Sequence, residues 1–200
     1  MAIIVSRIPG PPRVLIVDIT NNTLGFERQM LSDLLHKFKE TGIDLASDDV
    51  VIARTDEEYA AVFDRGLNFN ILLLVAHGAP DVSEVEASKV VIPGGRSNWY
   101  ELASRSSGLS NKLVCLAVCH GFCQDAIDAF VSSGEFALAL VAPNAKLSRT
   151  EVIEFFPRFF EELKESSLES IDPNHVRDAV GRQNQHSQDK MKIFSQAISS

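Results

Sequence analysis

Apolar residues follow two alternating patterns along this chain. Runs that are apolar almost throughout, typical of strands buried on both faces, alternate with segments in which apolar residues recur at helical spacing. The helical spacing is clearest from Leu24 to Phe38 and from Val152 to Leu163. The continuous runs are residues 13–19, 50–53, 70–76, 89–92, 112–118 and 136–141. We therefore expect strands that alternate with amphipathic helices.

Several of the predicted helices have capping residues at their ends. Gly42 follows the helix that starts near Leu24, and Ser148 and Glu151 have the spacing of a capping box. Asp172-Pro173 is a good start for a last, more polar helix, which we expect to include Val176 to Ile193. Shorter helices are expected at residues 56–63, 99–103 and 125–131.

This order of elements indicates the α/β class, with a mostly parallel central sheet flanked by helices on both faces, a three-layer sandwich. A proline-rich stretch at residues 9–12 separates an N-terminal tail, residues 1–12, from a single domain at residues 13–200. In such a sheet, ligands bind at the carboxyl ends of the strands. Candidate chemistry is therefore sought where the strands end.

Two of the predicted strands end at reactive side chains. His77 follows the run at 70–76, and Cys119 follows the run at 112–118. Because the carboxyl ends of parallel strands lie along one edge of a sheet, we expect the two side chains to meet there. An imidazole beside a thiol favours the nucleophilic thiolate and can protonate a leaving amine. His77 and Cys119 are therefore the candidate catalytic pair.

A glycine follows each candidate catalytic residue. Gly78 comes directly after His77, and Gly121 comes two positions after Cys119. Glycine lets a substrate backbone approach closely and leaves main-chain N–H groups free to face an oxyanion. We predict the N–H groups of Gly78 and Cys119 as the oxyanion donors. The structural alternative is that Cys119 is a small core residue and that His77 is satisfied by a backbone carbonyl.

The segments Val75-Ala76-His77-Gly78 and 116–121, Leu-Ala-Val-Cys-His-Gly, resemble the histidine-glycine and alanine-cysteine motifs of the caspase-like clan of cysteine peptidases. The bacterial CHAT branch of that clan is more similar, through the segments 90–95, 101–103 and 155–160, and the similarity spans about residues 13–182. The resemblance implies an intracellular cysteine endopeptidase with a caspase-like three-layer fold. It implies His77 as general base and acid and Cys119 as nucleophile.

The resemblance to the caspase-like clan does not define which substrate side chains the protein prefers. Ala117 stands where caspases have glutamine and where metacaspases carry an acidic residue that binds basic side chains. Asp18, after the first strand, is the other candidate for a specificity pocket. The resemblance further implies a protein or peptide substrate and an activating or regulatory protein partner.

Three other interpretations compete with the peptidase. Residues 92–95 and 117–121 also resemble a PfpI-type protein of the glutamine-amidotransferase-like superfamily, in which Cys119 would work with His120. A non-catalytic caspase-like scaffold would keep the motifs without the reactivity. A metal or haem site would use Cys115, Cys119, His120 and Cys123, but their spacing departs from zinc and haem patterns, and Cys115 is expected in the core. We therefore expect no metal and no cofactor.

The composition of the chain limits its expected binding partners and cellular compartment. The formal net charge is −8 and no Lys/Arg run is present, so nucleic acid is not an expected direct partner. No stretch approaches the roughly 20 apolar residues of a membrane span. Three cysteines, an odd number, suit a reducing compartment better than a disulfide framework. The sequence therefore predicts a cytoplasmic protein that does not contact membranes.

Overall fold

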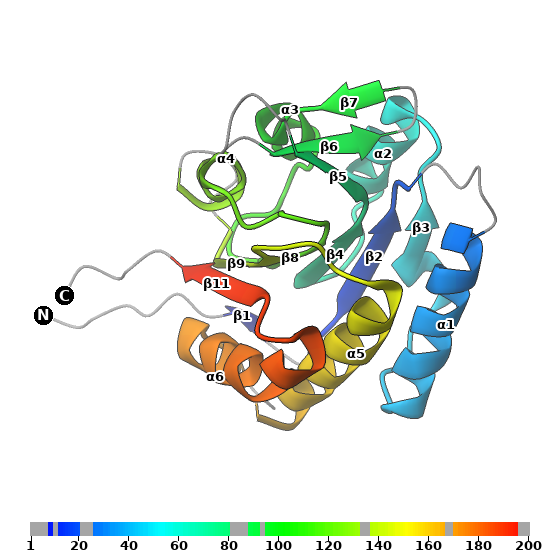
Figure 1. The fold of residues 1–200 in the computed structure, drawn as a ribbon. Coiled ribbons are helices and arrows are strands. Elements are labelled where there is room, and N and C mark those ends of the chain that lie inside the picture. The colour runs from blue at the N-terminus through cyan, green and yellow to red at the C-terminus, as the bar shows by residue number, and fades with distance from the viewer. Residues whose placement is uncertain are drawn as a thin grey trace, which may run out of the picture.

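A computed structural model describes residues 8–9, 12–20, 26–80, 88–92, 95–132, 137–166 and 170–195. Its main sheet has six strands in the order β11-β9-β8-β4-β2-β3 (Figure 1). Five of them run parallel, and β11 at one edge runs antiparallel to β9. The strands are β2 (Val14–Asp18), β3 (Val50–Ile52), β4 (Ile71–Val75), β8 (Leu113–Ala117), β9 (Ala139–Pro143) and β11 (Met191–Ser195). The predicted α/β class with a mostly parallel sheet is confirmed.

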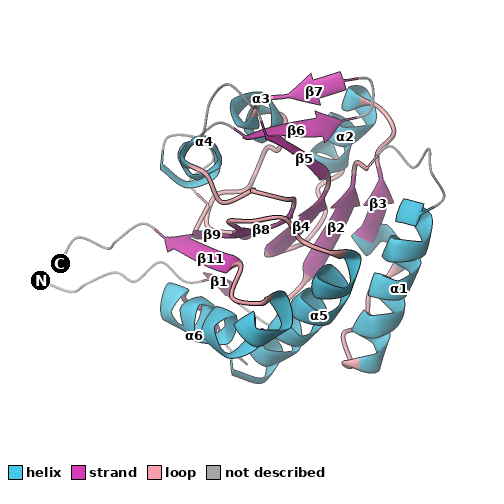
Figure 2. Ribbon diagram, in the orientation of Figure 1, coloured by secondary structure: helices cyan, strands magenta, loops and turns pink. Residues whose placement is uncertain are grey.

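Helices cover both faces of this sheet, which gives the predicted three layers (Figure 2). One face carries α1 (Phe26–Glu40), α5 (Arg149–Ser166) and α6 (Pro173–Gln183), and the other carries α2 (Asp56–Asp64), α3 (Trp99–Ser104) and α4 (Gln124–Ile127). Shorter helical turns lie at Ser47–Asp49, Asp128–Ser132 and Asn184–Ser187. Asp172 caps α6 as predicted, because its carboxylate accepts hydrogen bonds from the N–H groups of Asn174 and His175.

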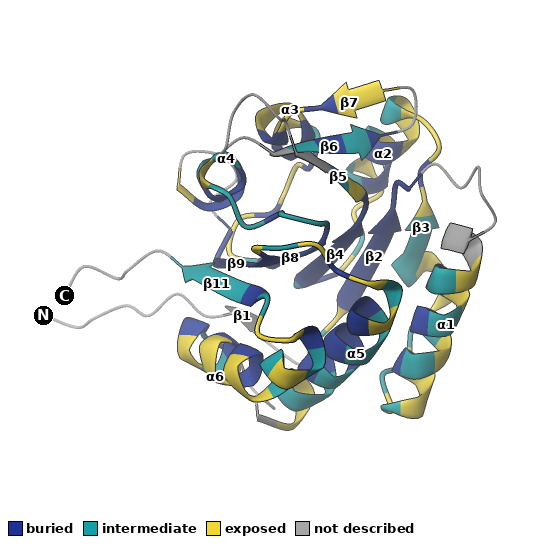
Figure 3. Ribbon diagram, in the orientation of Figure 1, coloured by how far each residue is buried: buried dark blue, intermediate teal, exposed yellow. Residues whose placement is uncertain are grey.

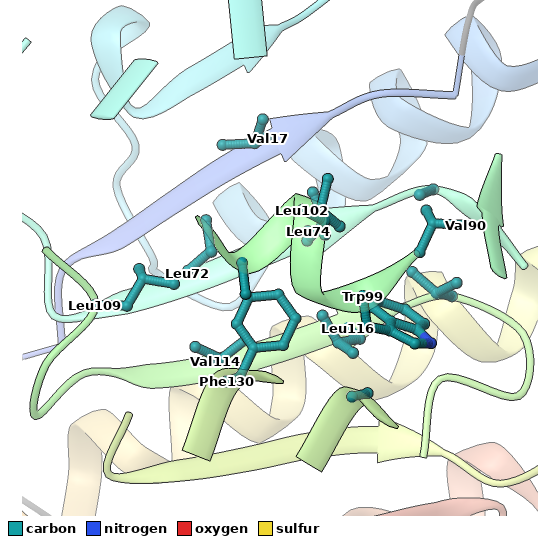
Figure 4. Close-up of a cluster of buried hydrophobic side chains, with 14 of the residues drawn as sticks. Val17, Leu72, Leu74, Val90, Trp99, Leu102, Leu109, Val114, Leu116 and Phe130 are labelled. Atoms are coloured by element: carbon teal, nitrogen blue, oxygen red, sulfur yellow. The ribbon is translucent and has the colours of Figure 1, made fainter. Parts of the chain in front are cut away.

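The sheet separates two hydrophobic cores, because its central strands are buried on both sides (Figure 3). The core under α1, α5 and α6 is rich in phenylalanine, with Phe38 stacked on Phe160 at 5.7 Å between ring centroids. The core under α2, α3 and α4 contains Trp99, which is fully buried and packs edge-on to Phe130 at 6.3 Å (Figure 4). Both helical layers are therefore fixed to the same strands.

A second, three-stranded antiparallel sheet branches from the end of β4. It contains β5 (His77–Pro80), β6 (Ser88–Ile92) and β7 (Gly95–Ser97) in the order β5-β6-β7. The run predicted at 89–92 is therefore a strand, but it pairs within this small sheet. Only Ala76 separates β4 from β5, so the chain passes from one sheet to the other at His77. The base candidate stands at that corner.

The chain ends depart from the predicted pattern. Near the N-terminus, Ile8–Pro9 (β1), in the expected tail, pairs with β10 (Ser170–Ile171).

Near the C-terminus, the prediction of a helix that continues to Ile193 is wrong beyond the turn at Asn184–Ser187. Gln188 and Asp189 adopt left-handed backbone conformations, with φ of 53° and 61°. Such conformations end a helix. The chain then returns as β11, with Met191 opposite Pro143. Leu24, Pro93, Gly94 and Phe136, used in the sequence patterns, lie outside the described residues.

Candidate active site

His77 and Cys119 follow neighbouring strands at the same level. In the parallel pair β4–β8, Val75 lies opposite Ala117, and each reactive residue comes two positions after its strand end. One further hydrogen bond extends this pairing, from the Ala76 N–H to the Ala117 carbonyl at 3.4 Å. Adjacent strands lie about 4.8 Å apart. The two segments predicted to meet at the carboxyl edge of the sheet are therefore neighbours.

Gly78 brings the two segments into direct contact. A Cβ atom at position 78 would lie 2.0 Å from the carbonyl oxygen of Cys119 and 3.0 Å from its carbonyl carbon. No side chain can occupy such a space, so only glycine lets the backbone after His77 cross the Cys119 peptide. The glycine that the sequence suggested for substrate access thus has a structural use as well, which is to join the two halves of the site.

The turn that carries Cys119 is fixed by its backbone. His120 has a left-handed conformation with φ of 57°, and its N–H donates to the Ala145 carbonyl at 3.1 Å. The Gly121 N–H donates to Val118 at 3.0 Å, and the Phe122 N–H donates to Pro143 at 2.9 Å. Within the described part of the chain, no acceptor takes a hydrogen bond from the Cys119 N–H. That amide is the one in the turn left available to an oxyanion.

The thiol of Cys119 faces the loop that follows β9. Its Sγ lies 3.7 Å from the carbonyl oxygen of Leu147, to which it can donate a hydrogen bond. Cys119 is partly buried against the phenylalanine-rich core, whereas His77 is exposed. In this arrangement the thiol is satisfied by a backbone carbonyl, and His77, which follows the neighbouring strand, is exposed.

The loop of residues 144–148, which carries Leu147, is itself held by Glu151. The Glu151 carboxylate accepts a hydrogen bond from the Ser148 N–H at 2.6 Å and pairs with the ammonium group of Lys190 at 2.6 Å. Glu151 is 6% exposed. Burial raises the pKa of Glu151, but hydrogen bonds from Lys190 and Ser148 outweigh burial, so that its pKa lies below its usual range. The Asn144 N–H also donates to the Lys190 carbonyl at 2.9 Å.

The two candidate pocket residues lie at the same level of the sheet. Asp18 and Ala117 are both opposite Val75, one on each side of β4. Both are buried, with exposed fractions of 1% and 6%. One carboxylate oxygen of Asp18 accepts hydrogen bonds from the N–H and the hydroxyl of Thr20, at 2.9 and 2.6 Å. Their role in substrate selection stays a prediction.

The three cysteines do not converge on one point. Cys115 is fully buried within β8, and burial raises its pKa well above the ordinary value. Cys119 packs against the core on one side of the sheet and Cys123 against the core on the other. All three are free thiols. Among the described residues, no group of three or more His, Cys, Asp or Glu side chains is arranged to hold a metal ion.

Compared with models of known protein families and with curated proteins, the sequence gives no match. Within the described residues, no helix combines the length and the apolar character that a membrane span requires.

Sequence reasoning missed two residues that shape the site. Leu147, which accepts the thiol hydrogen bond through its carbonyl, carries no sequence signal, because any residue offers a backbone carbonyl. Glu151 was expected only as a helix cap. Its pairing with Lys190, 39 positions away, depends on β11, which the sequence pattern did not reveal.

Proposed function

We propose that the chain is a caspase-like cysteine endopeptidase of the CHAT kind, with Cys119 as nucleophile and His77 as general base and acid. The observation that carries the proposal is the register of β4 and β8, which places His77 and Cys119 two residues beyond paired strand ends, with Gly78 against the Cys119 carbonyl. A nucleophile and a base on rigid neighbouring elements at the ligand-binding edge are the arrangement that covalent catalysis needs.

The reaction follows from this placement. His77 takes the thiol proton, and the Cys119 thiolate attacks the carbonyl carbon of a peptide bond. The oxyanion faces the N–H groups of Cys119 and Gly78, and the Cys119 N–H is available because it has no acceptor among the described residues. The imidazolium then protonates the leaving amine, and water hydrolyses the thioester to release the acid and restore the thiol.

The thiol must leave the Leu147 carbonyl before it can work with His77. In the proposed mechanism, rotation about the Cα–Cβ bond of Cys119 releases the hydrogen bond at 3.7 Å and frees the thiol to face His77. We infer that substrate or a regulatory protein partner supports this exchange. The proposed setting is the cytoplasm, which suits three unpaired cysteines.

Alkylation by iodoacetamide with mass-spectrometric site mapping tests the pair directly. We expect Cys119 to react near neutral pH, and the rate to fall at least about tenfold in His77→Ala. His120→Ala is the matched control and should alter the rate by less than about twofold, because His120 takes no part in activating the thiol in this proposal. A fall in His120→Ala alone would replace the proposal with the PfpI-type pairing. A Cys119 that is inert in every variant would favour a non-catalytic scaffold.

Cleavage of a mixed peptide library tests the activity itself. We expect Cys119→Ala to abolish cleavage, because no thiolate remains, and Cys123→Ala to retain it. Cys123 is a suitable control because it lies in the same segment, is partly buried and packs on the opposite side of the sheet. Equal cleavage by wild type and Cys119→Ala would remove the peptidase proposal.

A further inference from the structure

An open surface pocket of about 400 Å³ lies near the carboxyl end of β3, apart from Cys119. Its walls come from two segments, the turn from β3 into α2 and the adjoining ends of strands β6 and β7. This surface pocket, called here the two-arginine pocket, is lined by Arg54, Thr55, Asp56, Glu57, Ile92, Gly95 and Arg96. Its volume falls within the range of pockets that hold small ligands.

The two arginines reach this pocket from separate elements. Arg54 comes two positions after the end of β3, and Arg96 lies in β7. Neither guanidinium group makes an ion pair or a side-chain hydrogen bond within the described part of the chain. A guanidinium presents its N–H groups as a planar fork that matches a carboxylate or a phosphate. Two such groups around one pocket are suited to a bound oxyanion.

The acidic groups around the pocket are already engaged. Asp56 pairs with Arg105 at 2.7 Å, outside the pocket lining. Hydrogen bonds from its own N–H and from Thr55 lower the pKa of Glu57. Glu58 accepts a hydrogen bond from the Arg54 N–H at 2.6 Å. The carboxylates of Asp56 and Glu58 therefore have partners other than a guanidinium of the pocket, and Arg54 and Arg96 are the two cations of the described lining.

We propose that the two-arginine pocket binds an oxyanion group, a carboxylate or a phosphate, held between the guanidinium groups of Arg54 and Arg96. The pocket opens at the same edge of the sheet as the catalytic candidates, since Ile52 of β3 lies opposite Asp18 of β2, and Asp18 opposite Val75 of β4. The proposal is independent of peptidase activity, because it concerns binding alone.

Isothermal titration calorimetry on the full chain tests the pocket with two probes, inorganic phosphate and an acetylated peptide of four glutamates. We expect at least one probe to bind with a dissociation constant below about 1 mM at low ionic strength. Arg54→Gln and Arg96→Gln should each weaken that binding at least about tenfold. Tighter binding of phosphate would assign the site to a phosphate-bearing ligand, and tighter binding of the peptide would assign it to a carboxylate.

The matched control is Arg65→Gln, because Arg65 is an exposed arginine just after the other end of α2. It should leave the affinity within about twofold. Arg96→Lys keeps the charge but loses the planar fork, and it should bind more tightly than Arg96→Gln. Circular dichroism of each variant should match the wild type. If neither probe binds, or if Arg65→Gln weakens binding as much as Arg54→Gln, the proposal is wrong.

Discussion

The two strand ends that meet at the candidate active site are held in opposite ways. Cys119 is partly buried, and the amides of the next three residues donate to carbonyls that include Pro143 and Ala145. His77 is exposed and begins β5, opposite Val91 in the small sheet. Cys119 therefore takes its position from the main sheet and the loop after β9, and His77 takes its position from the small sheet. The two can be disturbed separately.

The largest loss of stability is expected where Gly78 contacts the Cys119 peptide. Gly78→Ala would place a Cβ atom 2.0 Å from the Cys119 carbonyl oxygen, so one backbone must move. We expect a loss of about 3 kcal/mol in the free energy of unfolding, as for an overpacked core position. Cys119 alkylation should also lose its dependence on His77. Urea denaturation and site-mapped alkylation measure both effects.

Gly95→Ala is the control for this change, because nothing lies within 4 Å of the Cβ atom it would add. Its free energy of unfolding should stay within about 0.5 kcal/mol of wild type. Unchanged stability and alkylation in Gly78→Ala would show that the two segments do not cross so closely, and the geometry of the site would have to be revised.

A smaller loss of stability is expected where Glu151 supports the loop that contacts Cys119. Glu151→Gln removes the charge that pairs with Lys190 at 2.6 Å and should cost about 2 kcal/mol at neutral pH. The pKa of Glu151 is lowered in the folded protein, so its contribution is present above the ordinary value of 4.5 and is lost as the pH falls below it. Thermal unfolding between about pH 7 and pH 3 should therefore show a weaker acid destabilisation in Glu151→Gln.

Glu165→Gln is the matched variant for that experiment, since Glu165 is an exposed acid on the same helix. It should keep the acid dependence of the wild type. If Glu165→Gln and Glu151→Gln behave alike, the pair with Lys190 does not stabilise the loop of residues 144–148. A change in Cys119 alkylation in Glu151→Gln alone would connect this loop to the thiol.

The smallest loss of stability is expected for a change at the helix cap beside the small sheet. Asn98 caps α3 directly after β7, and its side chain accepts a hydrogen bond from the Glu101 N–H at 2.8 Å. Asn98→Ala should cost about 1 kcal/mol in the free energy of unfolding and leave Cys119 alkylation unchanged. Denaturation and alkylation rates check both. A slower alkylation would mean that α3, as well as β5 and β6, sets the position of His77.

The sequence was sufficient to predict the strands of the main sheet that lie between helices. Segments such as 71–75 and 113–117 are continuously apolar because both of their faces are covered, and a short apolar run between helical segments is typical of a buried strand. The strand β11 was missed because Lys192 and Ser195 break the apolar run and the preceding residues are polar. An edge strand with one open side needs no continuous apolar pattern.

Part of the candidate site could be predicted because the buried strands could be recognised in the sequence. His77 and Cys119 stood out because each ends a recognisable strand, and the parallel sheet brings such ends together. Gly78 was expected to serve substrate access, and its contact with the Cys119 carbonyl needs three-dimensional structure. The two-arginine pocket was not foreseen, because Arg54 and Arg96 are 42 positions apart and neither follows a motif.

The buried indole of Trp99 also gives the chain an internal optical probe. Trp99 is the single tryptophan in the sequence, and its ring lies in the core under α2, α3 and α4, against Phe130. Its fluorescence should be that of an apolar environment and should move to longer wavelength when this core opens. Because Val90 of the small sheet belongs to the same core, emission at a fixed wavelength can follow the packing of the small sheet that begins at His77, while thiol alkylation follows Cys119.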